Sequence, residues 1–241
     1  MKRCIVFLLF GVMVFAVGTA HAQSVLVSQY QAYGYGYGAP GYANWTGALN
    51  TATSNNVQVA ANFENYAQML SYDALLLDVR DMSAVLSATE VSNLTSYIAT
   101  GRRVLMMGEN YHWTTWDSSV LGVVGGTYDP TVSTGTAIPV VAHELTQGIA
   151  GVHPQGGGMA SGGVSLFDMP FAHLWGDGNV LTLMDTGILD DWYGEYLDNP
   201  AFAVNVAEWL AGSTPTPIPG AIWLFGSGLL GLVGVRLRKK T

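Results

Sequence analysis

The stretch YDALLLDVRDMSAVLSATEVSNLTSYIATGRRVLMMGEN, residues 72–110, decides the fold. The segment ALLLDV, Ala74 to Val79, lacks the polar alternation of a half-exposed strand, which indicates a strand of a parallel sheet that is covered on both faces. Ser87 and Glu90 form a capping box that begins a helix, and Gly101 ends it. The apolar segment RVLMM then forms the next strand. Strand, helix and strand in this order predict an α/β fold.

The same alternation continues on both sides of this unit. We predict further strands at residues 24–30, 56–61, 137–142, 164–167 and 180–184, and helices at residues 44–52, 64–70, 114–123 and 200–210. The glycines at residues 156–158 and 162–163 match the hydrophobic periodicity of neither a helix nor a strand, and they predict a flexible insertion. Together these elements predict one domain over residues 23–212, a doubly wound, mostly parallel sheet flanked by helices.

The two ends of the chain read as targeting segments rather than as parts of the fold. Residues 1–22 combine basic residues, an apolar stretch and an Ala-x-Ala site before Gln23, which predicts a secretory signal peptide. Residues 213–219 form a Pro-rich linker, and residues 220–241 predict a transmembrane helix with a basic cytoplasmic end.

The C-terminal segment resembles the PEP-CTERM sorting signal of Gram-negative bacteria. The resemblance is carried by Pro217-Ile218-Pro219, by the wording WLFGSGLLGLVGV and by a basic end, although Ile218 replaces the acidic residue of the signature. The candidate sorting residues are Pro217, Pro219, Arg236, Arg238, Lys239 and Lys240. The resemblance implies export through the Sec translocon, an inner-membrane anchored precursor, and release by an exosortase-like membrane protease to the cell surface or the exopolysaccharide matrix. A plain single-pass anchor is the alternative.

The predicted domain is strongly acidic. It holds all 17 carboxylate residues but only three basic ones, Arg80, Arg102 and Arg103, so its net charge is −14. Such a charge excludes nucleic acid as a partner and is compatible with divalent cations or neutral polysaccharide. Because the single cysteine, Cys4, lies in the predicted signal peptide, the domain has no disulfide and no thiolate nucleophile.

Two segments of the domain resemble the class I glutamine amidotransferase-like, flavodoxin-like superfamily. These are residues 72–110, which are similar to its central strand, helix and strand, and residues 179–210, which are similar to the end of its noncatalytic members. The enzymes of the superfamily carry a cysteine at the turn after the central strand, where this chain has Gly108-Glu109-Asn110-Tyr111. The resemblance therefore implies a noncatalytic domain. His143-Glu144 begins an incomplete zinc-protease pattern, since Gln147 replaces its second histidine.

Two groups of side chains are candidate binding residues because each follows a predicted strand. They are Tyr33, Tyr35 and Tyr37 after the first strand, and Glu109, Asn110, His112 and Trp113 after the strand RVLMM. Ligands of open parallel sheets bind outside the carboxyl ends of the strands, so the groups are expected to face each other across one crevice and to stack on sugar rings. The alternative is that the tyrosine-rich loop packs over its own domain.

An acidic turn supplies a candidate metal site. Asp185, Asp190 and Asp191 offer hard oxygen ligands that suit Ca²⁺, and a solvated acidic face is the alternative. No other cofactor is expected. We thus predict an exported, noncatalytic binding or structural protein. A secreted hydrolase of polysaccharide or peptide, using Glu109, Asp185 and His112, is the alternative.

Overall fold

A seven-stranded sheet runs through the computed structural model, which describes residues 23–29, 34–192 and 196–212. The predicted signal peptide, Pro-rich linker and transmembrane helix lie outside these residues. Within the described ranges, no helix is long and apolar enough to cross a membrane.

The strand order of the sheet is β2-β1-β3-β4-β9-β8-β7, and its first five strands are parallel. Strands β8 and β7 continue the sheet in antiparallel pairing. The strands are β1 (Val25–Ser28), β2 (Val57–Ala60), β3 (Ala74–Leu77), β4 (Arg103–Met107), β7 (Val164–Ser165), β8 (Ala172–Trp175) and β9 (Val180–Leu183). Every residue of β1, β3, β8 and β9 is buried, as expected for strands covered on both faces.

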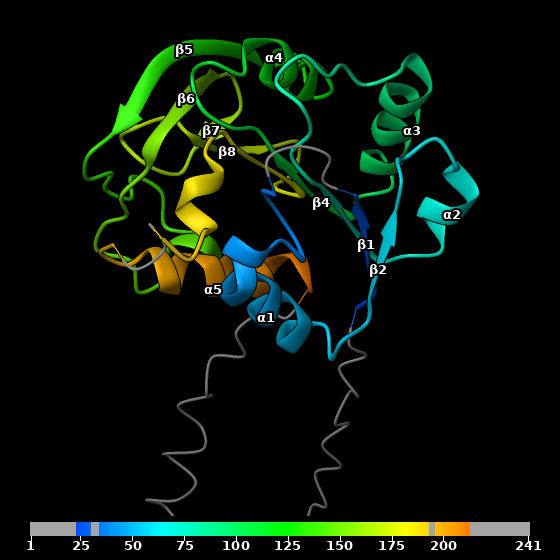
Figure 1. Ribbon diagram of the computed structural model, residues 1–241, viewed down its shortest axis with the longest axis horizontal. Coiled ribbons are helices and arrows are strands. Elements are labelled where there is room, and N and C mark those ends of the chain that lie inside the picture. The colour runs from blue at the N-terminus through cyan, green and yellow to red at the C-terminus, as the bar shows by residue number, and fades with distance from the viewer. Residues whose placement is uncertain (1–22, 30–33, 193–195, 213–241) are drawn as a thin grey trace, which may run out of the picture.

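Helices cover both faces of the sheet (Figure 1). Helices α1 and α5 lie side by side on one face, and α3 and α4 lie on the other. The helices are α1 (Ala43–Ala52), α2 (Tyr66–Leu70), α3 (Ala88–Ile98), α4 (Thr114–Gly122) and α5 (Asn199–Leu210), with short 3-10 turns η1 (Pro40–Tyr42), η2 (Glu144–Thr146) and η3 (Thr186–Leu189). The structure therefore confirms an α/β domain with a mostly parallel sheet flanked by helices.

The predicted capping box is present at the start of α3. The Glu90 amide donates to Ser87 Oγ at 3.1 Å, and the Ser87 amide donates to Glu90 Oε2 at 3.2 Å. The helix ends before Gly101, whose φ of +78° is a conformation that L side chains rarely adopt. Local sequence thus determines both ends of this helix.

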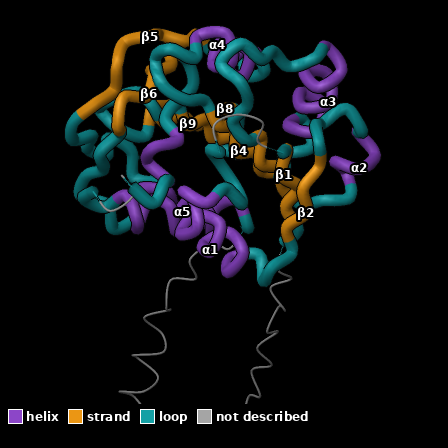
Figure 2. The backbone as a smooth tube through the Cα atoms, in the orientation of Figure 1, coloured by secondary structure: helices purple, strands orange, loops and turns teal. Residues whose placement is uncertain are grey.

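The structure corrects three of the sequence predictions, one of them through a second, two-stranded sheet. Strand β5 (Thr127–Thr134) pairs antiparallel with β6 (Gln155–Ser161), so the glycine-rich segment is a strand and not a flexible insertion (Figure 2). The strand predicted at residues 137–142 is wrong, because only two isolated bridges, at Ala137 and Pro139, form there. Strands β5, β6 and β8 were not predicted. Their glycines and polar residues interrupt the apolar–polar alternation by which a strand is predicted, and pairing with distant segments stabilises them.

The parallel strands have their amino ends at one edge of the sheet and their carboxyl ends at the other, and these two edges have different roles. At the amino edge, Gln23 and Gly212 lie against each other in one hollow that Asp73, Arg102 and Arg103 also line. The two ends of the described domain therefore meet there. The carboxyl ends of β1, β4 and β9 lie at the opposite edge, where the candidate site residues gather.

Candidate functional site

An open polar pocket of about 280 Å³ lies at the carboxyl edge of the sheet. We call it the Glu109 pocket; its lining residues are Tyr35, Tyr42, Glu109, Asn110, Gln155, Asp185, Thr186, Gly187, Asp190 and Trp192. The pocket brings together one residue of the predicted tyrosine group, two of the group after β4, and two of the predicted metal ligands. Tyr35 of the first group and Glu109 and Asn110 of the second therefore share one crevice.

Glu109 follows β4 and is held by three neighbours. Its amide donates to Asp117 Oδ1 at 2.9 Å, Thr186 Oγ1 donates to its Oε1 at 2.9 Å, and the Asn110 amide donates to its Oε2. The side chain is only 7% exposed, and burial raises its pKa above the ordinary glutamate value against the opposing effect of these donors. The Glu109 carboxyl group therefore faces the pocket with both of its oxygens already hydrogen-bonded.

Asp185 follows β9 and is almost completely buried. Its Oδ2 accepts from the Gln155 amide at 2.6 Å, and its Oδ1 accepts from the Gly187 amide at 2.9 Å. Burial raises the pKa of Asp185 to about 7, and the negative charges of Glu109 and Asp190 add to that increase. The carboxylate therefore fixes the backbone that closes one side of the pocket.

Strand β6 reaches this edge because residues 157 and 158 are glycines. The Gly158 amide is shared between the carbonyl oxygens of Glu109 and Met184, at 3.2 and 2.9 Å. A Cβ on Gly157 would overlap the Met184 carbonyl and Asp185, so any side chain there would push β6 off the site. The sequence analysis did not predict Gln155 as a pocket residue, because the glycines that follow it were interpreted as a flexible insertion. The run of three glycines is the signal that could have indicated a close approach of backbones.

Aromatic rings form the other wall of the site. The Tyr35 ring lies 6.3 Å from the rings of both Tyr42 and Trp113. Trp113 is 3% exposed and supports Tyr35 from behind, whereas Trp192 is 69% exposed at the mouth of the pocket. Among the aromatic residues that line the pocket, Trp192 is therefore the most exposed, and it was not predicted.

The Tyr42 hydroxyl is the one buried polar group of the pocket that no hydrogen bond satisfies within the described residues. The residue is 1% exposed, and its burial raises the tyrosine pKa well above its ordinary value. The nearby Thr186 side chain opposes this increase, and the negative charges of Asp190, Glu109 and Asp78 add to it. The hydroxyl is thus a potential donor that remains for a ligand.

Two predicted site residues, Tyr37 and His112, lie away from the pocket lining. Tyr33 is outside the described residues. The Tyr37 hydroxyl donates to Asn50 Oδ1 at 2.7 Å, so this side chain packs over its own domain. His112 is exposed, and its ring lies 3.9 Å from that of Tyr111 rather than in the pocket lining.

The acidic turn is largely buried, and its carboxylates do not surround a common metal position. Asp185 and Asp190 are 3% and 5% exposed, so a solvated acidic face is wrong for these two. Asp191 accepts from the Ala43 and Asn44 amides at 2.9 and 3.0 Å and thereby caps α1. Among the described residues, no three His, Cys, Asp or Glu side chains are arranged as metal ligands.

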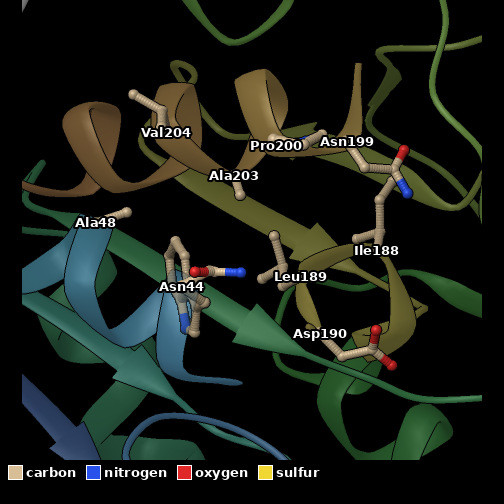
Figure 3. Close-up of a pocket in the computed structure, with 10 residues that line it drawn as sticks. Asn44, Ala48, Ile188, Leu189, Asp190, Asn199, Pro200, Ala203 and Val204 are labelled. Carbon is tan, nitrogen blue, oxygen red and sulfur yellow. The ribbon is translucent and has the colours of Figure 1, made fainter. Parts of the chain in front are cut away.

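A second pocket, of about 350 Å³, lies between α1 and α5 (Figure 3). Ala48 of α1 and Ala203 and Val204 of α5 face it together with Leu189. Its walls are mostly apolar, and the polar residues Asn44, Asp190 and Asn199 also line it. It offers shape but few polar groups to orient a ligand, so the Glu109 pocket is the stronger candidate.

No family model matches the sequence, and no curated protein matches it. Among solved structures, the mmIFT52 N-terminal domain is similar with a TM-score of 0.59 and 14% identity, over 78% of this chain and 97% of that one. A protein described as part of a GMP synthase, from Thermoplasma acidophilum, has a TM-score of 0.47 and 7% identity, over 79% of this chain and 95% of that one. Alpha-L-fucosidase isoenzyme 2 from Paenibacillus thiaminolyticus has a TM-score of 0.49 and 12% identity, over 81% of this chain and 33% of that one. At these identities the first likeness shows a shared fold alone.

Proposed function

We propose that the protein is an exported cell-surface or matrix protein whose noncatalytic α/β domain binds polysaccharide in the Glu109 pocket. The observation that carries the proposal is the combination of one open aromatic face, Trp192, with polar groups that converge at the carboxyl edge of a parallel sheet. Export, sorting by an exosortase-like protease and association with exopolysaccharide rest on the two ends of the sequence.

The strand order supports the amidotransferase-like, flavodoxin-like assignment. The first five strands, β2-β1-β3-β4-β9, follow the 2-1-3-4-5 order of flavodoxin-like sheets. The position of the enzymes' nucleophile, directly after β4, is occupied by Gly108 and Glu109. A Cβ on Gly108 would lie 2.7 Å from Asp117 Oδ1, so this turn has little room for the side chain of a nucleophile. A noncatalytic domain fits this geometry.

The position of the chain ends suits a surface-anchored binder. Gly212 lies at the amino edge of the sheet beside Gln23, and the Glu109 pocket lies at the opposite edge. An anchor that continues from residue 213 would therefore hold the domain with the pocket directed away from the membrane. Such an orientation leaves the pocket open to an extracellular polymer.

Affinity electrophoresis of the full chain through gels that contain soluble glycans tests the binding. We expect retardation of the parent and its loss in Trp192→Ala. Tyr111→Ala is the matched control, because Tyr111 is an exposed aromatic residue outside the pocket. Equal mobility of all three proteins in every glycan would overturn the proposal.

A polysaccharide hydrolase is the second candidate, and one observation favours it. Glu109 and Asp185 line the same pocket, and burial raises the pKa of both, which is the direction of shift that favours a general acid. Release of reducing ends by the parent, abolished in Glu109→Gln, would establish this activity and refute the noncatalytic assignment. Our proposal predicts no release by either protein.

A further inference from the structure

Trp192 joins the Glu109 pocket to a second hollow. That hollow is shallow, measures about 430 Å³, and is lined by Gly34, Pro40, Gly41, Asp191 and Trp192. A Cβ on Gly41 would lie 3.2 Å from Cη2 of Trp192, so the indole lies directly over the glycine backbone. The Trp192 amide donates to Asp190 Oδ1 at 2.9 Å, which fixes the start of this side chain. An indole that lines both hollows can support a ligand that occupies both.

The described residues around these hollows include acidic side chains and no basic ones. Among the described residues that line them, Glu109, Asp185, Asp190 and Asp191 are acidic and none is basic. The three arginines of the domain are placed elsewhere. Arg80 pairs with Glu90, and Arg102 and Arg103 line the hollow at the amino edge of the sheet. A ligand with carboxylate or phosphate groups would meet unbalanced repulsion, whereas a cationic ligand would be attracted.

The Tyr42 hydroxyl is an independent sign of a polar ligand. It lines the pocket on a residue that is 1% exposed, and no hydrogen bond satisfies it within the described residues. A buried hydroxyl without a partner costs free energy that a ligand acceptor can recover. Sugar hydroxyl and ring oxygens are acceptors of this kind.

We propose that the ligand of the Glu109 pocket is a polysaccharide with free amino sugars, that is, hexosamine units with protonated amines. This inference rests on the proposed function and names its substrate class. The apolar face of a pyranose ring stacks on Trp192, and the ammonium group of that unit donates to Glu109 and Asp190. Tyr42 donates to a ring or hydroxyl oxygen. Each contact uses a group that is already in place.

Isothermal titration of the full chain in mild detergent tests the inference with three probes of equal length. They are oligomers of glucosamine, of N-acetylglucosamine and of galacturonic acid, which carry positive, zero and negative charge on similar rings. We expect glucosamine oligomers to bind about 10–100-fold more tightly than N-acetylglucosamine oligomers, as one charge-assisted hydrogen bond predicts. Galacturonic acid oligomers should show no binding.

Two variants and one control locate the effect. Glu109→Gln should lose most of the preference for the amino sugar but retain N-acetylglucosamine binding, because it removes charge and keeps shape. Trp192→Ala should weaken every sugar. Asp177→Asn is the control for charge alone, since Asp177 is exposed and follows β8, away from the pocket. It should leave all affinities unchanged.

The possible failures are distinguishable. Equal or tighter binding of the neutral or acidic oligomer overturns the inference and leaves polysaccharide binding intact. Absence of binding to any glycan overturns both. A rise in melting temperature with Ca²⁺ alone, lost in Glu109→Gln and without sugar binding, would make the pocket a cation site and would also overturn the inference.

Discussion

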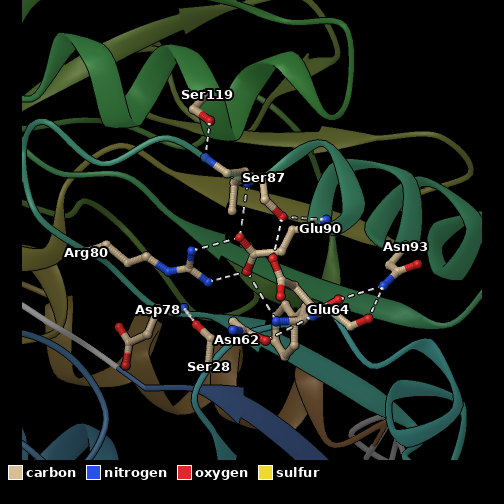
Figure 4. A network of polar contacts seen from close by, with 11 residues as sticks. Ser28, Asn62, Glu64, Asp78, Arg80, Ser87, Glu90, Asn93 and Ser119 are labelled. Carbon is tan, nitrogen blue, oxygen red and sulfur yellow. Dashed lines mark hydrogen bonds and ion pairs between the residues drawn. The ribbon is translucent and has the colours of Figure 1, made fainter.

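Replacement of Glu90 by alanine should destabilise the domain strongly, because Glu90 is the centre of a buried polar network (Figure 4). Its carboxylate accepts two hydrogen bonds from Arg80, at 3.0 and 2.5 Å, and one each from the Phe63 and Ser87 amides, both at 3.2 Å. The side chains of Arg80 and Glu90 are 7% and 4% exposed. Glu90→Ala therefore leaves a buried guanidinium and two amides without acceptors.

The expected cost follows from these contacts. Removal of one partner of a buried ion pair costs about 3–5 kcal/mol, because the remaining charge stays desolvated. Arg80 keeps only a cation–π contact, 5.6 Å from the centre of the Trp116 ring. For a domain of this size, a loss of about 3–5 kcal/mol corresponds to a decrease in melting temperature of about 6–20 °C.

Urea denaturation followed by circular dichroism measures the loss, and two further variants isolate its cause. Glu144→Gln breaks the Arg103–Glu144 pair, whose side chains are 23% and 22% exposed, and should cost less than about 1 kcal/mol. Arg80→Met combined with Glu90→Gln removes both charges and keeps the capping acceptor, so it should recover most of the stability. A loss for Glu90→Ala no larger than for Glu144→Gln would refute the reasoning.

Three further predictions follow from the structure. Burial raises the pKa of Asp117 to about 8, against about 4 in the unfolded chain, so between these values the folded state binds a proton that the unfolded chain has lost. The free energy of unfolding should therefore decrease as pH rises from about 4 to 8. Asp117→Asn should flatten this decrease in urea titrations at pH values across that window. Gly157→Ala, which forces overlap with backbone, should cost about 1–3 kcal/mol, whereas Gly47→Ala, on an open helix face, should stabilise by about 0.5–1 kcal/mol; thermal melts that show the same sign for both would contradict the packing. Intact-mass measurement should find an exported form that begins at Gln23 and ends within residues 215–219, and a mature form that keeps the basic terminus would contradict sorting.

The elements that the sequence predicted well are those whose signals are local. The uninterrupted apolar run of β3, the capping box of Ser87 and Glu90, and Gly101 after α3 each depend on a few neighbouring residues. Burial patterns and end signals of this kind determine a strand or helix wherever the chain folds. They were sufficient for the fold class, and the position of Glu109 after β4 followed from them.

The sequence by itself therefore determined the α/β class, the charge of residues 23–212 and the absence of cysteine from them. Tertiary structure alone decided that a glycine run forms β6 on the site, that Asp191 caps α1, and that Trp192 opens beside Glu109. These features depend on contacts between segments far apart in the chain, such as Asp191 with Ala43. Side-chain types and spacing do not encode such contacts, because they form only when the whole sheet brings its carboxyl ends together.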